Sequence, residues 1–196
     1  KKVINCLTED NPVINKKLRK VSVDEGLKIA EELLNILSER KDGIGLAANQ
    51  IGYDARVAVV NIREPLILIN PVIIEQWDEI NYYEGCLSFP KKGIHTKRYK
   101  NVIVQTEQEE SGWYFSGVET VQEAKGTWEQ AGKKQDQEQR LLESVCVQHE
   151  IDHLNGVTIM DREYKRKPIR VSQKWGRNEI VGITDGKELV EMKYKK

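Results

Sequence analysis

Two histidines and a glutamate lie close together in the C-terminal third of the sequence, where His149, Glu150 and His153 form an H-E-x-x-H motif. On a helix, residues four apart point to nearly the same side, offset by about 40°. Both imidazoles can therefore reach one metal ion from one face. Glu150 lies between them and can hold a water molecule bound to that ion. The motif thus predicts a metal centre that activates water.

A catalytic centre of this type needs a third protein ligand beside one open position. A third histidine six residues after His153 would indicate one class of metalloprotease, but that position is Ile159. A later glutamate, Glu163 or Glu179, would give a thermolysin-type site, although neither lies in a recognisable motif. The remaining candidate is Cys86, which lies in the segment Glu84-Gly85-Cys86-Leu87-Ser88-Phe89-Pro90. Glycine there permits close backbone approach, and proline stiffens the exit.

Two helices are predicted from apolar spacing. Leucine and alanine recur at three- and four-residue steps over 24–40, and Asp24 and Glu25 favour the helix start through the helix dipole. The second helix covers about 139–155 and carries the H-E-x-x-H motif, with Gly156 as its stop signal. The segment 43–52, Gly-Ile-Gly-Leu-Ala-Ala-Asn-Gln-Ile-Gly, follows the first helix.

Four strands are predicted from runs rich in valine, isoleucine and aromatic residues. Pro71 interrupts one of them, which indicates an edge strand or a bulge. Residues 123–139 are polar and weakly patterned, and we expect mostly loop there. An Asp-Gly turn signal predicts a C-terminal hairpin over about 179–192. The strands are expected at 56–62, 66–74, 99–106 and 112–121.

Length and charge bound the function class. The chain has 196 residues, which we interpret as one domain, 1–196. It has 31 basic and 31 acidic residues, so no net charge favours binding to nucleic acid. No apolar run approaches the roughly 20 residues that span a bilayer, and we expect no membrane partner. Three cysteines fit a reducing compartment better than a disulfide framework.

Three segments together resemble the motifs of peptide deformylase, in the same order and at plausible separations. They are 43–50 (Gly-Ile-Gly-Leu-Ala-Ala-Asn-Gln), 84–88 (Glu-Gly-Cys-Leu-Ser) and 148–154 (Gln-His-Glu-Ile-Asp-His-Leu), and the similarity covers roughly 5–161. The resemblance implies removal of the N-terminal formyl group from newly made polypeptides. It also implies an α+β fold, in which mixed or antiparallel β-sheets surround a central helix bearing H-E-x-x-H.

The resemblance also assigns residue roles. Cys86, His149 and His153 would bind one divalent metal, and Glu150 would take a proton from the attacking water and return it to the departing amine. The tetrahedral oxyanion would be stabilised by the Gln50 side-chain amide and the Leu87 backbone N–H. We expect iron(II) as the metal in cells, with zinc, nickel or cobalt as alternatives, since a thiolate with two imidazoles suits all four.

The implied substrate is an extended N-formylmethionyl peptide. Backbone groups near Ile44, Gly45 and Gly85 would pair with it as in strand addition. Its methionine side chain would enter an apolar pocket, lined by Ile44, Leu142, Val145, Cys146 and His149. Glu84 and Arg98 would either form an ion pair behind the cysteine segment or remain independent surface charges.

Two segments differ from the usual family pattern. The polar stretch at about 107–138 is longer, and would either cover the substrate cleft or form a surface insertion. A hairpin ends the chain where many bacterial members have a helix. The basic cluster formed by Lys165, Arg166, Lys167 and Arg170 could contact ribosomal RNA weakly or be a solvated face. We expect a monomer in the cytoplasm, with an organelle or a phage-infected bacterial cytoplasm as alternatives.

Two rival functions remain open at this point. A thermolysin-type endopeptidase would use Glu179 as the third metal ligand. A non-catalytic metal- or peptide-binding domain descended from such an enzyme would have no use for a general base at Glu150, and the retained glutamate argues against it.

Overall fold

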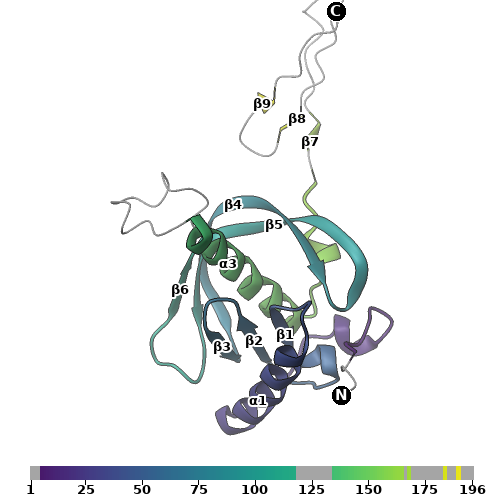
Figure 1. The fold of residues 1–196 in the computed structure, drawn as a ribbon, viewed down its shortest axis with the longest axis vertical. Helices are drawn as coiled ribbons and strands as arrows, with labels where there is room; N and C mark the ends of the chain where they lie inside the picture. The colour runs from purple at the N-terminus through teal and green to yellow at the C-terminus, as the bar shows by residue number, and fades with distance from the viewer. Residues whose placement is uncertain (1–4, 118–133, 166, 169–182, 185–188, 191–196) are drawn as a thin grey trace, which may run out of the picture.

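The computed structural model describes residues 5–117, 134–165, 167–168, 183–184 and 189–190. Two antiparallel three-stranded sheets enclose a long helix, α3 (Lys134–Leu154), which contacts β1 and β2 of one sheet and β5 and β6 of the other (Figure 1). This arrangement confirms the predicted α+β class with antiparallel sheets around a central helix. The helix carries both motif histidines.

The first sheet has the order β1-β2-β3, with bounds Gly45–Ala47, Val57–Asn61 and Pro65–Ile69. Side chains of β2 alternate between its two faces, as in any strand. Val57 and Val59 join the buried cluster that includes the apolar face of α1 (Val23–Glu39), whereas Ala58 and Val60 join the cluster beneath α3. Helices thus cover both faces, which explains why this strand is apolar at successive positions.

Helix α1 begins and ends close to the predicted bounds. The Ser22 hydroxyl accepts a hydrogen bond from the Glu25 backbone N–H at 3.2 Å, which caps the first turn. Asp24 and Glu25 occupy that turn, where the helix dipole favours negative charge. Its buried residues recur on one side, and they are Gly26, Ile29, Ala30, Leu33, Ile36 and Leu37.

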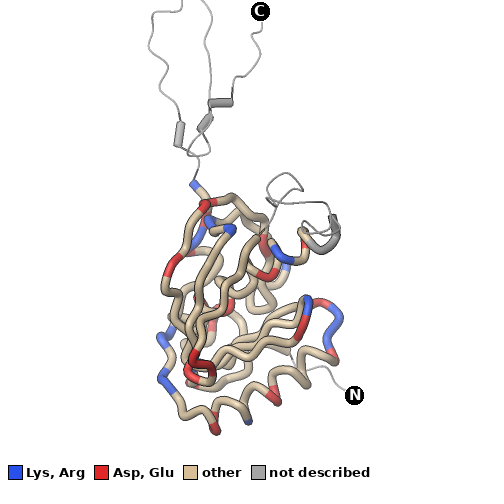
Figure 2. The backbone as a smooth tube through the Cα atoms, turned by 90° about the vertical axis from the view of Figure 1, so that its left-hand side faces the viewer, with Lys and Arg blue, Asp and Glu red and all other residues tan. Residues whose placement is uncertain are grey.

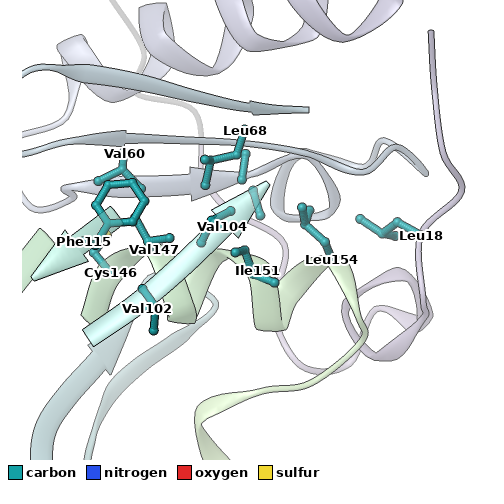
Figure 3. Close-up of a cluster of buried hydrophobic side chains, with 12 residues drawn as sticks. Leu18, Val60, Leu68, Val102, Val104, Phe115, Cys146, Val147, Ile151 and Leu154 are labelled. Carbon is teal, nitrogen blue, oxygen red and sulfur yellow. The ribbon is translucent and has the colours of Figure 1, made fainter. Parts of the chain in front are cut away.

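The second sheet has the order β4-β5-β6, with bounds Val72–Cys86, Phe89–Gln105 and Trp113–Ser116. β4 and β5 form a long curved hairpin that arches over α3 (Figure 1). Figure 3 shows the core between the sheets, where Val147, Ile151 and Leu154 of α3 lie among Val60, Leu68, Val102 and Val104. The apolar side of α3 therefore fixes the helix, so that its histidines have a defined position.

Two sequence-based expectations are wrong. The strand expected over 66–74 is two strands in different sheets, because Asn70 adopts a left-handed conformation with φ 48° and Pro71 cannot donate to a ladder. Helix α3 begins at Lys134, so residues 134–139 are helical although we expected loop there. Lysine, glutamine and glutamate are good helix formers, but a first turn without apolar residues gives no periodic signal.

The remaining elements are short. They comprise the 3₁₀ turns η1 (Pro12–Asn15), η2 (Ala48–Ile51) and η3 (Ile159–Arg162), and a third sheet of β7 (Lys167–Pro168), β8 (Ile183–Thr184) and β9 (Leu189–Val190). β8 pairs antiparallel with β9, whereas the expected turn between them and half of the polar stretch at 107–138 lie outside the described residues. In the part of the chain that the structure describes, no helix combines the length and apolar character that crossing a bilayer requires.

Candidate metal centre and substrate cleft

Three side chains from two elements converge on one point. Cys86 ends β4, and His149 and His153 lie one turn apart on α3. Cys86 Sγ lies 3.3 Å from His153 Nε2, and His153 Nε2 lies 3.2 Å from His149 Nε2. All three potential ligand atoms lie within 4.8 Å of one another. Residues 86 and 153, far apart in sequence, are thus brought into one cluster by the packing of α3 under the β4–β5 hairpin.

The donor spacing fits a single tetrahedral metal ion. Bonds of about 2.0–2.1 Å to nitrogen and about 2.3 Å to sulfur put two nitrogens about 3.4 Å apart, and nitrogen and sulfur about 3.6 Å apart. The observed distances, 3.2 Å between the two Nε2 atoms and 3.3 Å between Cys86 Sγ and His153 Nε2, are close to these values. A thiolate and two imidazoles are also a ligand set that divalent transition metals prefer. The cluster therefore fits a divalent metal with a fourth position left for another ligand.

His149 is oriented by an acid behind it. Its Nδ1 lies 2.8 Å from Glu84 Oε1, so the ring donates there and presents Nε2 to the cluster. Burial by itself raises the pKa of Glu84, but hydrogen bonds from His149 and Arg98 outweigh it and lower that pKa to about 2. Glu84 is therefore ionised, as a partner that fixes the orientation of a ligating histidine must be.

A buried ion-pair network holds Glu84 in turn. Arg98 on β5 is only 2% exposed and donates from Nε to Glu84 Oε2 at 2.5 Å and from Nη2 to Glu84 Oε1 at 3.1 Å. Its Nη1 donates to Asp152 Oδ2 at 2.6 Å. Asp152 also accepts from Arg162 Nη2 at 2.8 Å. The Glu84–Arg98 pair is therefore present, whereas no sequence pattern indicated that Asp152 and Arg162 would join it.

Glu150 lies beside the cluster in a tight environment. It is 3% exposed, and its Oε2 has no hydrogen-bond partner among the described residues. A Cβ at Gly45 would lie 2.4 Å from Glu150 Oε1 and 2.7 Å from Cys146 Sγ, so only glycine lets β1 approach here. Burial raises the pKa of Glu150 to about 7, although the nearby His149 acts to lower it. A carboxyl group with such a pKa is suited to exchanging protons near neutral pH.

Gln50 is fixed next to the cysteine. It is 1% exposed, and its Oε1 accepts from the Ala47 backbone N–H at 2.9 Å. Its amide nitrogen donates to Ser88 Oγ at 3.2 Å and lies 3.9 Å from Cys86 Sγ. The amide thus places N–H groups beside the three candidate metal ligands, where a hydrogen-bond donor to an oxyanion would be needed.

One cavity of about 590 Å³ opens onto this cluster. Every predicted substrate-contacting residue lines it: Ile44, Gly45, Gly85, Leu142, Val145 and Cys146. Gln50, Leu87, His149 and Glu150 line it as well, whereas His153 lies deeper, at 2% exposure. The three motifs did not indicate the other lining residues, which are Arg40, Asp42, Tyr82, Tyr83, Phe89, Pro90, Lys91 and Lys92. Their position next to the three motifs was the only sequence signal for them.

Comparison with known proteins agrees with this geometry. The sequence matches the polypeptide deformylase family over residues 3–168. A peptide deformylase of Dictyoglomus thermophilum is 35% identical over 155 residues, which cover 78% of this chain and 87% of that protein. Among solved structures, the Thermotoga maritima peptide deformylase aligns with a TM-score of 0.64 and 28% identity, covering 84% of this chain and 100% of that one. That of Vibrio parahaemolyticus bacteriophage VP16T, in complex with actinonin, aligns with a TM-score of 0.60 and 31% identity, covering 80% and 100%.

Proposed function

Because the chain belongs to the polypeptide deformylase family and removes the N-formyl group from newly made polypeptides, we propose that Cys86, His149 and His153 hold the divalent metal of that reaction. The observation that carries this assignment is the spacing of Sγ and the two Nε2 atoms at 3.2 Å and 3.3 Å at the floor of the cleft. A metal held there supplies Lewis acidity, which polarises the formyl carbonyl and lowers the pKa of water.

Glu150 is the proton carrier in this proposal. Its Oε2 has no hydrogen-bond partner among the described residues, and the residue lines the cleft. It accepts a proton from the attacking water and passes it to the amine nitrogen as the C–N bond breaks, which releases formate. Its burial supports this role because a raised pKa makes both transfers accessible near neutral pH.

The oxyanion that forms at the formyl carbon needs donors at fixed positions. We assign these to the Gln50 side-chain amide, whose nitrogen lies 3.9 Å from Cys86 Sγ, and to the backbone N–H of Leu87, which follows Cys86; both residues line the cavity. The hydrogen bonds of Gln50 to Ala47 and Ser88 support the assignment, since they hold the amide in place before substrate binds. Losing one such donor typically costs about 3–4 kcal/mol of barrier.

The substrate lies between β1 and the end of β4 as an added strand. Backbone groups of Ile44, Gly45 and Gly85 pair with it, and all three residues line the cavity. The methionine side chain enters the apolar part formed by Leu142, Val145 and Cys146, next to His149. An unbranched, polarizable side chain suits a pocket of that kind.

The physiological metal in this proposal is iron(II), with zinc, nickel and cobalt as substitutes. The mixed sulfur and nitrogen ligand set supports this range of metals. Metal analysis of anaerobically purified protein, paired with activity, tests it. Full activity with zinc alone and none with iron(II) would refute iron as the working metal.

We further propose that residues 1–196 form one catalytic domain that acts as a monomer in the cytoplasm or an organelle, where formylated chains are made. Weak ribosome association through the basic cluster at 165–170 is a separate proposal, and Arg166 and Arg170 of that cluster lie outside the described residues. Sedimentation with and without ribosomes tests both the oligomeric state and the association.

Formate release from formyl-Met-Ala-Ser tests the assignment directly. Glu150→Gln should keep the metal and lose most turnover, because a carboxamide cannot accept the proton. Cys86→Ala should lose the metal, whereas a thermolysin-type site that used Glu179 would keep it. Cys6→Ala is the matched control, since Cys6 is a half-buried cysteine outside the cluster. Unchanged turnover in Glu150→Gln would contradict the mechanism.

A further inference from the structure

A bulge of β5 lies against the end of β4 at the mouth of the cleft. Gly85 pairs with Gly93, but the next residue, Cys86, pairs with Phe89, so residues 90–92 have no partner on β4. The bulge stays close to the strand, because the Lys92 carbonyl oxygen would lie 3.8 Å from a Cβ at Gly85. It therefore flanks the backbone segment to which we assign substrate pairing, and its residues Pro90, Lys91 and Lys92 line the cavity.

Of the basic residues at this mouth, two form ion pairs and one does not. Lys92 Nζ lies 2.8 Å and 3.0 Å from the two carboxylate oxygens of Glu9. Arg40 binds Asp42 with two hydrogen bonds, at 2.9 Å and 2.8 Å. Lys91 is exposed and makes no ion pair or hydrogen bond with another side chain of the described residues. Its ammonium is therefore the cation at the cleft mouth that is left for a ligand.

The acids that line the same cavity do not compensate for Lys91. Asp42 is paired with Arg40, and Glu84 with Arg98 and His149. Glu150 is buried next to the three candidate metal ligands. Along the tube in Figure 2, Lys and Arg positions are interspersed with Asp and Glu positions. Among the described residues, Lys91 is thus left without a carboxylate partner in this cavity.

We propose that Lys91 makes the enzyme favour substrates with an acidic side chain at the first or second residue after the formylmethionine; this inference rests on the proposed function. An extended chain advances about 3.3 Å per residue, and its side chains alternate between two sides. Once the methionine occupies the pocket, the residues that follow leave through the mouth, past the bulge. A carboxylate there meets an ammonium with no other partner, whereas a lysine meets a like charge.

The expected preference is modest, because the pair is exposed to water and to salt. Exposed ion pairs of this kind correspond to about a two- to five-fold effect on an equilibrium. Screening weakens them as ionic strength rises. The ratio of kcat/KM for an acidic peptide to that for a basic peptide should therefore exceed one at low salt and approach one at high salt.

The test measures formate release from formyl-Met-Ala-Asp-Ala and formyl-Met-Ala-Lys-Ala, and from the pair with the charged residue directly after methionine. The wild-type enzyme should favour the acidic member of at least one pair. Lys91→Glu should reverse that ratio, and Lys91→Met should bring it close to one. Lys17→Glu is the control, because it makes the same change of charge on an exposed lysine that lines a different cavity.

The outcomes separate this inference from the proposed function. No formate from any of the peptides would mean that the proposed function itself fails. Formate release with equal kcat/KM for both members of each pair would overturn the role of Lys91 alone. A ratio that shifts as much in Lys17→Glu as in Lys91→Glu would also overturn it, since net charge would then explain the preference.

Discussion

Replacing the buried Arg98 with methionine should lower the free energy of unfolding far more than replacing a cation on the surface. The guanidinium is 2% exposed and binds two carboxylates, Glu84 and Asp152, which are 7% and 5% exposed. Methionine fills much of the same volume but carries no charge. Among the described residues, Glu84 would then keep His149 and Thr96 as side-chain partners, and Asp152 would keep Arg162.

The size of the effect follows from burial. Removing one partner of a buried ion pair typically costs about 3–5 kcal/mol, because the remaining charge has no compensation. A domain is stable by about 5–15 kcal/mol, so the loss is a large fraction of the total. Lys97→Met is the matched control: its Nζ lies 2.6 Å from Glu79, but the two side chains are 48% and 37% exposed. Such a surface pair contributes about 0–1 kcal/mol.

The assay is urea unfolding followed by two independent probes, which should coincide if unfolding is two-state. Arg98→Lys keeps a charge but not the bidentate geometry, and should lose an intermediate amount. It also provides a readout if the methionine variant does not fold. Metal affinity should fall by about 10–100-fold in Arg98→Met, because Glu84 would no longer orient His149 firmly. A stability loss equal to that of Lys97→Met would refute the reasoning.

Three further predictions concern the site. Gly45→Ala should reduce kcat/KM by about a hundredfold, because the added Cβ meets Glu150 at 2.4 Å, whereas Gly112→Ala, with its nearest atoms at 3.6 Å, should stay close to wild type in the same assay. The pKa of Glu84 is lowered from 4.5 to about 2, so its stabilisation is present above about pH 4.5 and is lost as the pH falls through about 2; Glu84→Gln should flatten this part of the stability–pH curve in urea unfolding. Chelation should abolish formate release and lower Tm, and added iron(II) or zinc should restore both; a chelated protein with full activity would contradict the metal assignment.

Apolar spacing and charge at helix ends predicted the first helix, but they did not predict the long β4–β5 hairpin. The first helix follows from leucine spacing and from acidic residues at its start, and α1 matches it within a residue. The long hairpin of β4 and β5 was largely missed. All residues of β4 except Glu84 are exposed or half-buried, and its polar and apolar residues do not alternate regularly. Its pairing with β5, which joins positions distant in sequence, defines the strand instead. Pro71, interpreted as the mark of an edge strand or a bulge, lies where the chain passes from one sheet to the other.

In the site too, features set by local helix geometry were predicted, whereas those set by the tertiary fold were not. H-E-x-x-H predicted that two imidazoles share one helix face, because helix geometry is local. Sequence spacing alone could not choose between Cys86 and Glu179 as third ligand, since only the fold brings β4 over α3. Asp152 was inside the recognised motif, yet its contacts with Arg98 and Arg162 depend on η3 and β5 meeting at that point. Lys91 likewise has no local signal, because its position depends on a bulge.

X-ray absorption of the metal-loaded protein tests the central claim most directly, since it counts the sulfur and nitrogen atoms bound to the ion. The proposal predicts one sulfur at about 2.3 Å and two imidazole nitrogens at about 2.0–2.1 Å in the wild-type protein. Cys86→Ala, loaded with excess metal, should lose the sulfur contribution, whereas Cys6→Ala should retain it. A metal site without sulfur in the wild-type protein would contradict the account.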